Sequence, residues 1–180
     1  MAQSIVTANA TIHAPIARVF ALSTRIELVR ETLGMTAHPS GKPGSLTAGH
    51  IQLHSRVLWR GWKFLLPTEH HTLITGYDEP HLKAPGLTTA WFQDSQEQGR
   101  FATFQHDHHF RETLDPDTQQ PVTELHDEVR FSLPFGPLGR LATAWLLAPH
   151  VRALCCRRFA RIKALAEGNG WLDFVDPTQL

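Results

Sequence analysis

The stretch Phe101-Ala-Thr-Phe-Gln-His-Asp-His-His-Phe-Arg111 alternates between aromatic or histidine side chains and more polar ones. Successive side chains of an extended chain point to opposite faces, so this period of two predicts a half-buried β-strand. The inner face of that strand would carry Phe104, His106, His108 and Phe110. Residues 124–133 repeat the pattern, with an inner face of Leu125, Asp127, Val129 and Phe131. Two such strands around a loop rich in Asp and Pro indicate an antiparallel sheet.

Further strands of this sheet are predicted earlier in the sequence. Residues 5–12 alternate in the same way and predict a first strand. Alternation also predicts strands at residues 51–60, at about 69–77 and at 88–93. The short spacing between these segments and the turn residues that separate them favour a meander.

Two short helices are predicted directly after the first strand. Pro15 suits the first turn of a helix because its missing N–H has no helical partner there. This helix would carry Ile16, Val19 and Phe20 on one stripe. The capping-box pair Thr24 and Glu27 predicts that a second helix starts at Thr24, and Gly34 would end it.

Apolar residues at three- and four-residue steps predict one long amphipathic helix near the C-terminus. They are Leu138, Leu141, Trp145, Ala148, Val151, Cys155, Phe159, Ile162 and Ala166. Pro149 lies inside this pattern and is expected to kink or break the helix. Residues 1–168 are therefore predicted to form one α+β domain, a curved antiparallel sheet around the long helix. Residues 169–180 have no periodicity and are expected to form a tail or a short docking strand.

Several motifs resemble those of the helix-grip proteins of the START-like superfamily (SRPBCC). They are Phe92-Gln-Asp94, Gly99-Arg-Phe101, Phe104-Gln-His-Asp-His-His-Phe110 and Glu128-Val-Arg-Phe-Ser-Leu-Pro-Phe-Gly-Pro-Leu-Gly139. The pattern is most similar to the bacterial polyketide cyclase/dehydrase-type branch, with Asp127 where that branch has an acidic residue. The resemblance implies a helix-grip fold with a ligand cavity between sheet and helix. Pro149 and the Cys155-Cys156 pair depart from the pattern and leave the choice of ligand open.

Composition excludes several other classes of protein. The 180 residues include 17 Lys+Arg and 17 Asp+Glu, without the basic excess usual in nucleic-acid binders. The only two cysteines are adjacent and cannot join distant segments, which excludes a disulfide scaffold and favours a cytoplasmic location. No apolar run is long enough to span a bilayer. Gly136 and Gly139 lack the Lys and Ser/Thr of a phosphate-binding loop, and no cofactor is expected.

The unusual feature of the composition is its 12 histidines, of which His106 and His108 form the sharpest candidate site. Residues two apart on a strand share a face at a separation of about 6.5 Å. Together with Asp127 they fit three interpretations: a hydrogen-bonded pocket lining, an acid/base group, or ligands of one metal ion. The pocket lining is the preferred interpretation, and no metal is assigned.

The leading functional hypothesis is that the cavity binds a small hydrophobic or amphipathic molecule such as a lipid, quinone or polyketide. The expected ligand-binding residues are Leu53, Val57, Trp59, Phe92, Phe104, His106, His108, Phe110, Val129, Phe131 and Trp145. One alternative is a cyclase or dehydratase in which His106 or His108 abstracts a proton and Asp127 orients it. Another is a metal-binding or protein-interaction module. No sequence feature predicts an oligomeric state.

Overall fold

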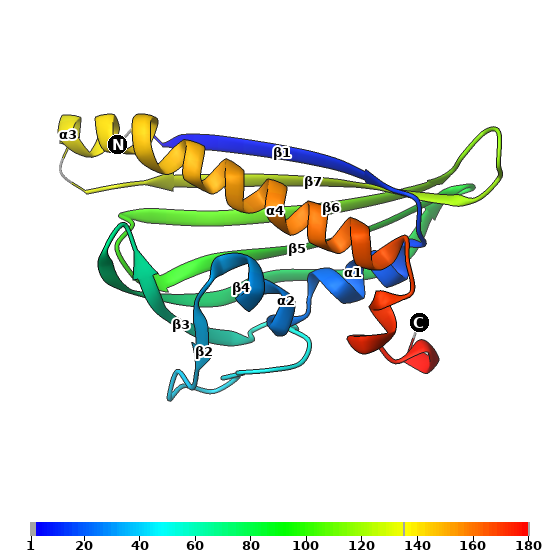
Figure 1. The fold of residues 1–180 in the computed structure, drawn as a ribbon, viewed down its shortest axis with the longest axis horizontal. Helices are drawn as coiled ribbons and strands as arrows, with labels where there is room; N and C mark the ends of the chain where they lie inside the picture. The colour runs from blue at the N-terminus through cyan, green and yellow to red at the C-terminus, as the bar shows by residue number, and fades with distance from the viewer. Residues whose placement is uncertain (1–2, 135, 180) are drawn as a thin grey trace.

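The strands predicted from alternation form a single antiparallel sheet in the computed structural model, which describes residues 3–134 and 136–179 (Figure 1). The seven strands are β1 (Ser4–Ile12), β2 (Thr36–His38), β3 (Arg56–Lys63), β4 (Leu66–Ala84), β5 (Leu87–Gln98), β6 (Thr103–Leu114) and β7 (Pro121–Ser132). Their order across the sheet is β1-β7-β6-β5-β4-β3-β2. The strands from β2 to β7 are thus a meander, and β1 joins its far edge by pairing with β7.

Helices cover one face of this curved sheet. Two short ones, α1 (Ile16–Ser23) and α2 (Ile26–Leu33), follow β1 as predicted. The C-terminal helix is built from α3 (Gly136–Ala142), a π-helical turn η1 (Thr143–Leu147) and α4 (Ala148–Ala166). Figure 1 shows this helix lying obliquely over the sheet, with its last turns beside α1. The predicted α+β architecture, a curved antiparallel sheet around a long C-terminal helix, is confirmed.

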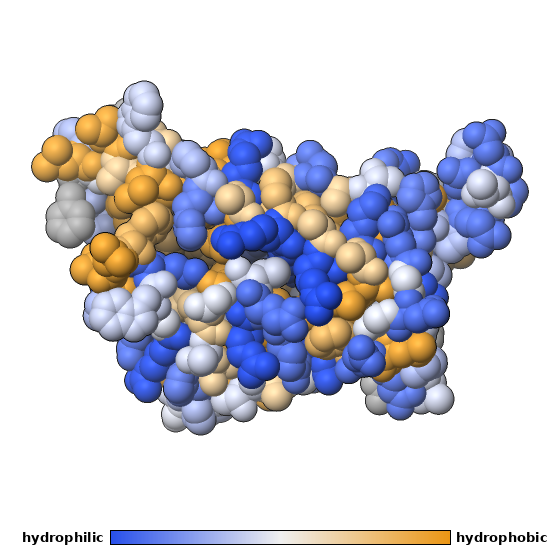
Figure 2. All heavy atoms as spheres, in the orientation of Figure 1, coloured by the Kyte–Doolittle hydropathy of each residue, from blue (hydrophilic) through white to orange (hydrophobic). Residues whose placement is uncertain are grey.

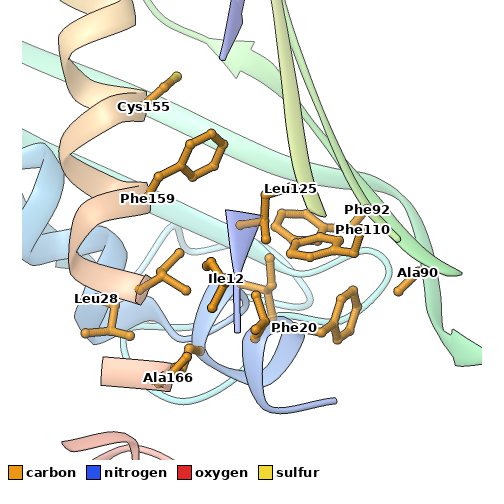
Figure 3. Packing of buried hydrophobic residues seen from close by; sticks show 14 of the residues in the cluster. Ile12, Phe20, Leu28, Ala90, Phe92, Phe110, Leu125, Cys155, Phe159 and Ala166 are labelled. Atoms are coloured by element: carbon orange, nitrogen blue, oxygen red, sulfur yellow. The ribbon is translucent and has the colours of Figure 1, made fainter. Parts of the chain in front are cut away.

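The hydrophobic core lies between the sheet, α1 and the second half of α4. Cys155 and Phe159 project from α4 toward a group of apolar side chains that includes Phe20 of α1 (Figure 3). Phe20 packs edge-on against Phe92 and Phe110, with ring centroids 6.0 and 5.3 Å away. Such edge-to-face contacts stabilise aromatic cores beyond the burial of their area. The core therefore joins the helices to the middle strands of the sheet.

The prediction that Thr24 and Glu27 form a capping box at the start of the second helix is wrong. Helix α2 starts later than predicted, after Arg25, which caps it without a side-chain hydrogen bond. The Thr24 hydroxyl donates to the carbonyl of Ala21 in α1, and the Glu27 carboxylate accepts from the N–H of Gly49. Both side chains thus hold neighbouring segments rather than each other. The predicted end at Gly34 is confirmed, and its φ of 60° is one that glycine adopts without strain.

The strand predicted at residues 51–60 is shorter at its start than expected. Its first half is a loop, because the Ser55 hydroxyl accepts a hydrogen bond from the Gln52 N–H and closes a turn. The Ile51 N–H donates to Thr24 outside the sheet, and His54 has a φ of 67°. Strand β3 starts only at Arg56. Residues 51–55 alternate between polar and apolar side chains as a strand does, but their local hydrogen bonds form a turn instead.

Pro149 lies in the first turn of α4, directly after the π-helical turn. The chain therefore remains helical, and the expected disturbance takes the form of a π-turn that widens the helix before the proline. Such a turn rotates the residues before it relative to those after it. Among the described residues, no helix is long and apolar enough to cross a membrane.

The last described residues, 169–179, form two short 3-10 turns, η2 (Gly170–Asp173) and η3 (Pro177–Gln179), rather than a docking strand. They nevertheless pack against the domain. Val175 is buried, and the guanidinium of Arg18 stacks over the Trp171 ring at 4.4 Å. The C-terminal segment therefore covers the end of the core beside α1.

Candidate functional site

The pairing of β5, β6 and β7 brings four titratable side chains together on the face of the sheet that α4 covers. Asp94 of β5 pairs with His106 of β6, and His108 of β6 pairs with Asp127 of β7. Residues two apart share a face, so all four side chains project toward α4. The structure thus brings together the predicted group of His106, His108 and Asp127, and it adds Asp94.

Asp127 is the centre of this group. One of its carboxylate oxygens lies 2.8 Å from Nδ1 of His108, and the other lies 3.1 Å from Nε2 of His106. Asp94 lies on the opposite side of the two rings, with one oxygen 3.3 Å from Nε2 of His108 and 3.7 Å from Nδ1 of His106. The two imidazole rings are therefore held between two carboxylates, with their centroids 3.7 Å apart.

Arg158 of α4 completes what we call the charged cluster: Asp94, His106, His108, Asp127 and Arg158. Its guanidinium donates to Asp127 at 3.2 Å, and its Nη1 lies 2.8 Å from Nδ1 of His108. It also donates to the main-chain carbonyl of Ser23 at the end of α1, at 2.9 Å. One side chain therefore connects the long helix, the sheet and α1.

Two members of the charged cluster were not predicted as site residues, although the sequence contains a signal for each. Asp94 lies two residues after Phe92 on a strand and therefore shares its inner face. Arg158 lies three residues after Cys155 and four before Ile162, so it belongs to the buried stripe of the helix. Arg158 thus faces the interior, whereas its neighbour Arg157 is exposed.

The surroundings of His106 and His108 shift the pKa values of the two residues in opposite directions. Burial lowers the pKa of His106, but the charge and hydrogen bond of Asp127, with further help from Cys155 and Asp94, raise it to about 10. For His108 burial prevails, and the positive charges of His106 and Arg158 add to it, so its pKa is lowered despite Asp127. At neutral pH His106 is thus protonated and His108 is neutral.

The two carboxylates remain ionised although burial opposes their charge. The pKa of Asp127 lies well below its usual value because, at the acidic pH where this carboxyl titrates, the charges of His108 and His106 and their hydrogen bonds outweigh desolvation. The pKa of Asp94 is lowered by its hydrogen bond to His108 and by the charges of the nearby histidines. Two negative charges therefore face two positive ones, on His106 and Arg158, and the charged cluster is neutral overall.

Access to the charged cluster is one-sided. The side chains of His108 and Asp127 are 3% and 2% exposed, whereas those of Asp94 and His106 are 15% and 14% exposed. Phe104 lies two residues before His106 on β6 and so shares its face of the sheet, and its ring contacts that of His70 at a centroid distance of 5.0 Å. A small molecule that reached the accessible edge formed by Asp94 and His106 would meet a donor on His106 and an acceptor on Asp94.

Within the described part of the chain, two overlapping sets of side chains have the spacing for a metal ion. Asp94, His106 and His108 each offer one ligand atom, and these atoms lie within 4.8 Å of one another. His106, Asp127 and Cys155 meet the same criterion. In either set an ion would have to displace the proton of His106, because a ligating imidazole nitrogen is unprotonated. Arg158 would add a positive charge next to it.

The predicted ligand-binding residues divide into three groups. Val57, Trp59, Phe92, Phe110, Val129 and Phe131 are buried in the core, and the Phe92 ring stacks on His108 at a centroid distance of 4.1 Å. Phe104 is half-buried near the accessible edge. Leu53 and Trp145, in contrast, lie on the surface, 50% and 80% exposed. Leu53 belongs to the loop before β3, and Trp145 lies within the π-helical turn, which directs it away from the sheet.

A cleft of about 750 Å³ lies at a different place from the cavity that we expected between the sheet and α4. It is open to solvent and lies between α2, β2 and the β3–β4 hairpin. Its walls include Met35, Trp62, Arg60 and Glu69. The accessible edge of the charged cluster does not belong to it.

Comparisons with known proteins identify the fold. The sequence matches no protein-family model and no curated protein sequence. Among solved structures, a START superfamily protein from Mycobacterium smegmatis has a TM-score of 0.59 at 12% identity, over 89% of this chain and 98% of that one. A protein from Thermus thermophilus has a TM-score of 0.56 at 14% identity, over 91% and 99% of the two chains.

A third solved structure is that of an enzyme. Norcoclaurine synthase from Thalictrum flavum, in complex with dopamine and hydroxybenzaldehyde, has a TM-score of 0.50 at 8% identity, over 89% of this chain and 86% of that one. At these identities the similarity concerns the path of the chain and not its chemistry. Together with the sheet order and the long C-terminal helix, the matches show that this chain has the helix-grip fold of START-like proteins.

Proposed function

We propose that the protein binds a small amphipathic molecule between the sheet and the C-terminal helix, with the polar group of that molecule at the Asp94–His106 edge of the charged cluster. The observation that carries this proposal is the one-sided access. His108 and Asp127 are closed off, whereas Asp94 and His106 remain 15% and 14% exposed. A buried charged group that keeps an open side can exchange its water for a ligand.

The chemistry of this edge favours a hydroxyl or carbonyl group on the ligand. Protonated His106 is a donor and ionised Asp94 is an acceptor, so a hydroxyl can use both. Phe104 and the ring of His70, whose pKa is lowered mainly by burial, provide a less polar surface beside them. Norcoclaurine synthase, which shares the fold, is in complex with dopamine and hydroxybenzaldehyde, and this supports phenols and aromatic aldehydes as the first compounds to test.

Calorimetry and native mass spectrometry with a series of phenols, aromatic aldehydes, quinones and fatty acids test the proposal. The informative variant is His106→Gln, which keeps a polar side chain but removes the charge. Its matched control is His109→Gln, three residues further along the same strand and exposed on the outer face. We expect His106→Gln to weaken binding by about tenfold or more, since a charged hydrogen bond is lost, and His109→Gln to bind as the original protein does.

Two outcomes would overturn the binding proposal. One is that no compound of the series binds to the folded protein. The other is that binding persists unchanged in His106→Gln while circular dichroism shows that the variant is folded. If His106→Gln does not fold, Phe104→Ser provides a second variant at the same edge, since Phe104 is only half-buried.

Acid–base catalysis is a second candidate function, favoured by the separated pKa values of the two histidines. A pKa of about 10 keeps His106 protonated at neutral pH, so its N–H can stabilise the negative charge that develops on a carbonyl oxygen, with Asp127 as the group that orients the ring. Asp94 is the accessible carboxylate and would be the base, because His108 is closed off. This assignment differs from our initial one, in which a histidine was the base. His106→Gln should then lower the turnover of a carbonyl substrate by more than it weakens binding of that substrate.

The cysteines bear on where the protein works. Cys155 is buried and Cys156 is exposed, and both are free thiols. We place the protein in the cytoplasm, where exposed thiols stay reduced.

A further inference from the structure

Large apolar side chains are exposed at one end of the molecule, on two segments that are far apart in the sequence. We define the apolar end by Leu138, Leu141, Trp145 and Leu146 of the helix and Trp62, Phe64, Leu65 and Leu66 of the β3–β4 hairpin. The two segments meet where the Phe64 ring packs against His150, at a centroid distance of 5.0 Å. Figure 2 shows the hydrophobic residues gathered at this end of the molecule, where Figure 1 places α3.

The tip of the hairpin adopts a conformation that its residues disfavour. Phe64 and Leu65 form the two-residue turn between paired Lys63 and Leu66, with φ values of 51° and 61°. A turn with two positive φ values favours Asn and Gly, and large apolar residues are strained there. Leu65 is 92% exposed, so burial within the domain does not compensate for this strain. The tip is therefore built at a cost in stability, and strain of this kind is typical of binding sites.

The charge around the apolar end is positive. The chain as a whole is neutral, yet residues 32–68 and 129–166 contain no Asp or Glu, whereas both segments contain Arg and Lys. Burial, and then the charges of Lys63 and Arg157, lower the pKa of His150 beside the tip. Arg152 and Arg157 are exposed on α4. The exposed apolar residues thus lie among basic side chains, and the nearest acidic residue of the hairpin, Glu69, is paired with Arg60 at 2.7 Å.

We propose that the apolar end docks onto an anionic phospholipid surface. Basic residues around exposed Leu, Phe and Trp match a negatively charged membrane interface, where apolar side chains insert and Trp rings lie at headgroup level. Trp62 and Trp145 are 70% and 80% exposed, as such a role requires. A second copy of this chain fits less well, because a twofold contact would bring the same positive charges face to face. This docking is independent of the ligand proposed for the charged cluster.

Vesicle flotation tests the docking, with phosphatidylcholine vesicles compared to vesicles that also contain phosphatidylglycerol. We expect binding to the anionic vesicles only, weakened by added salt, and a blue shift of tryptophan fluorescence on binding. The informative variant combines Phe64→Asn with Leu65→Gly. It supplies the residues that the turn favours, so we expect the melting temperature to stay the same or rise, while vesicle binding falls by about tenfold or more.

The control variant is Leu82→Ser, on β4 near its opposite end, where a leucine that is 70% exposed lies away from the apolar end. It should leave vesicle binding unchanged. The proposal is wrong if anionic vesicles do not bind the protein, or if the double variant is folded and binds them as well as before. A stable dimer in solution that the double variant dissociates, without vesicle binding, would show instead that this end is an interface between copies.

Discussion

Asp127→Asn is the substitution that most directly tests why His106 stays protonated in the charged cluster. Asp127 is almost completely buried, and its carboxylate lies 3.1 Å from Nε2 of His106. Burial alone lowers the pKa of His106, whereas the charge and the hydrogen bond of Asp127 are the main causes that raise it to about 10. Asparagine has the same shape without the charge. The variant therefore removes the electrostatic interaction and preserves the packing.

The size of the effect follows from the pKa of His106. A change from 6.5 to about 10 corresponds to about 5 kcal/mol of interaction between the proton and its surroundings. Below pH 6.5 both the folded and the unfolded chain bind this proton, so the stabilisation is fully present. Between pH 6.5 and about 10 only the folded chain keeps it, and the free energy of unfolding should fall by about 1.4 kcal/mol per pH unit. Above that range the stabilisation is lost.

Urea unfolding at a series of pH values, with NMR titration of the His106 ring, measures both quantities. At pH 6 we expect Asp127→Asn to lose about 3–5 kcal/mol, the usual cost of leaving a buried charge unpaired. In this variant the free energy of unfolding should also no longer fall between pH 6.5 and 10. The control is Asp107→Asn, a buried carboxylate on the other face that pairs with Arg130 at 2.6 Å and contacts no histidine of the charged cluster.

Three results would refute this reasoning. The first is a His106 ring that titrates near pH 6.5 in the original protein. The second is a decline in stability between pH 6.5 and 10 that is the same in Asp127→Asn. The third is a loss of that decline in Asp107→Asn, because the decline would then not belong to the charged cluster.

Three further predictions concern other parts of the same region. Arg158→Met should lower the free energy of unfolding by about 3 kcal/mol, since Asp127 loses a buried partner. The control is Arg157→Met, on the exposed side of α4, which should change the free energy of unfolding by less than about 0.5 kcal/mol in the same urea titration. Phe92→Ala should cost about 3–5 kcal/mol by leaving a cavity beside the His108 ring; a cost near zero would mean that the site collapses freely. Cys156 should react with Ellman's reagent in the folded protein and Cys155 only after unfolding, and equal rates would contradict the burial of Cys155.

The inner face of the sheet was predictable because alternation depends only on backbone geometry. The grouping of His106, His108 and Asp127 required the period of two and the assumption that neighbouring strands pair. The electrostatic difference between the two histidines was not predictable. It depends on distances to Asp94 and Arg158, which belong to segments 14 and 50 residues away from His108 in the sequence.

Local hydrogen bonds and helix geometry explain where the predictions failed. Thr24 and Glu27 have the spacing of a capping box, but their side chains bind Ala21 and Gly49, which only the folded chain brings near. Trp145 fits the stripe of an ideal helix, but the π-helical turn shifts its position around the axis. In both cases the pattern fits an isolated element, and the surroundings of that element changed the outcome.

The neutrality of the charged cluster constrains how this site can change over evolutionary time. At a pH where His106 keeps its proton, loss of either Asp127 or Arg158 alone leaves one charge unpaired in the interior, whereas loss of both leaves Asp94 paired with His106. A single substitution at Asp127 or Arg158 therefore lowers stability, and replacements at these two positions should arise as compensating pairs. The double variant Asp127→Asn with Arg158→Gln should accordingly cost less than the sum of the two single variants. Close relatives of this chain are expected to keep both residues or to replace both.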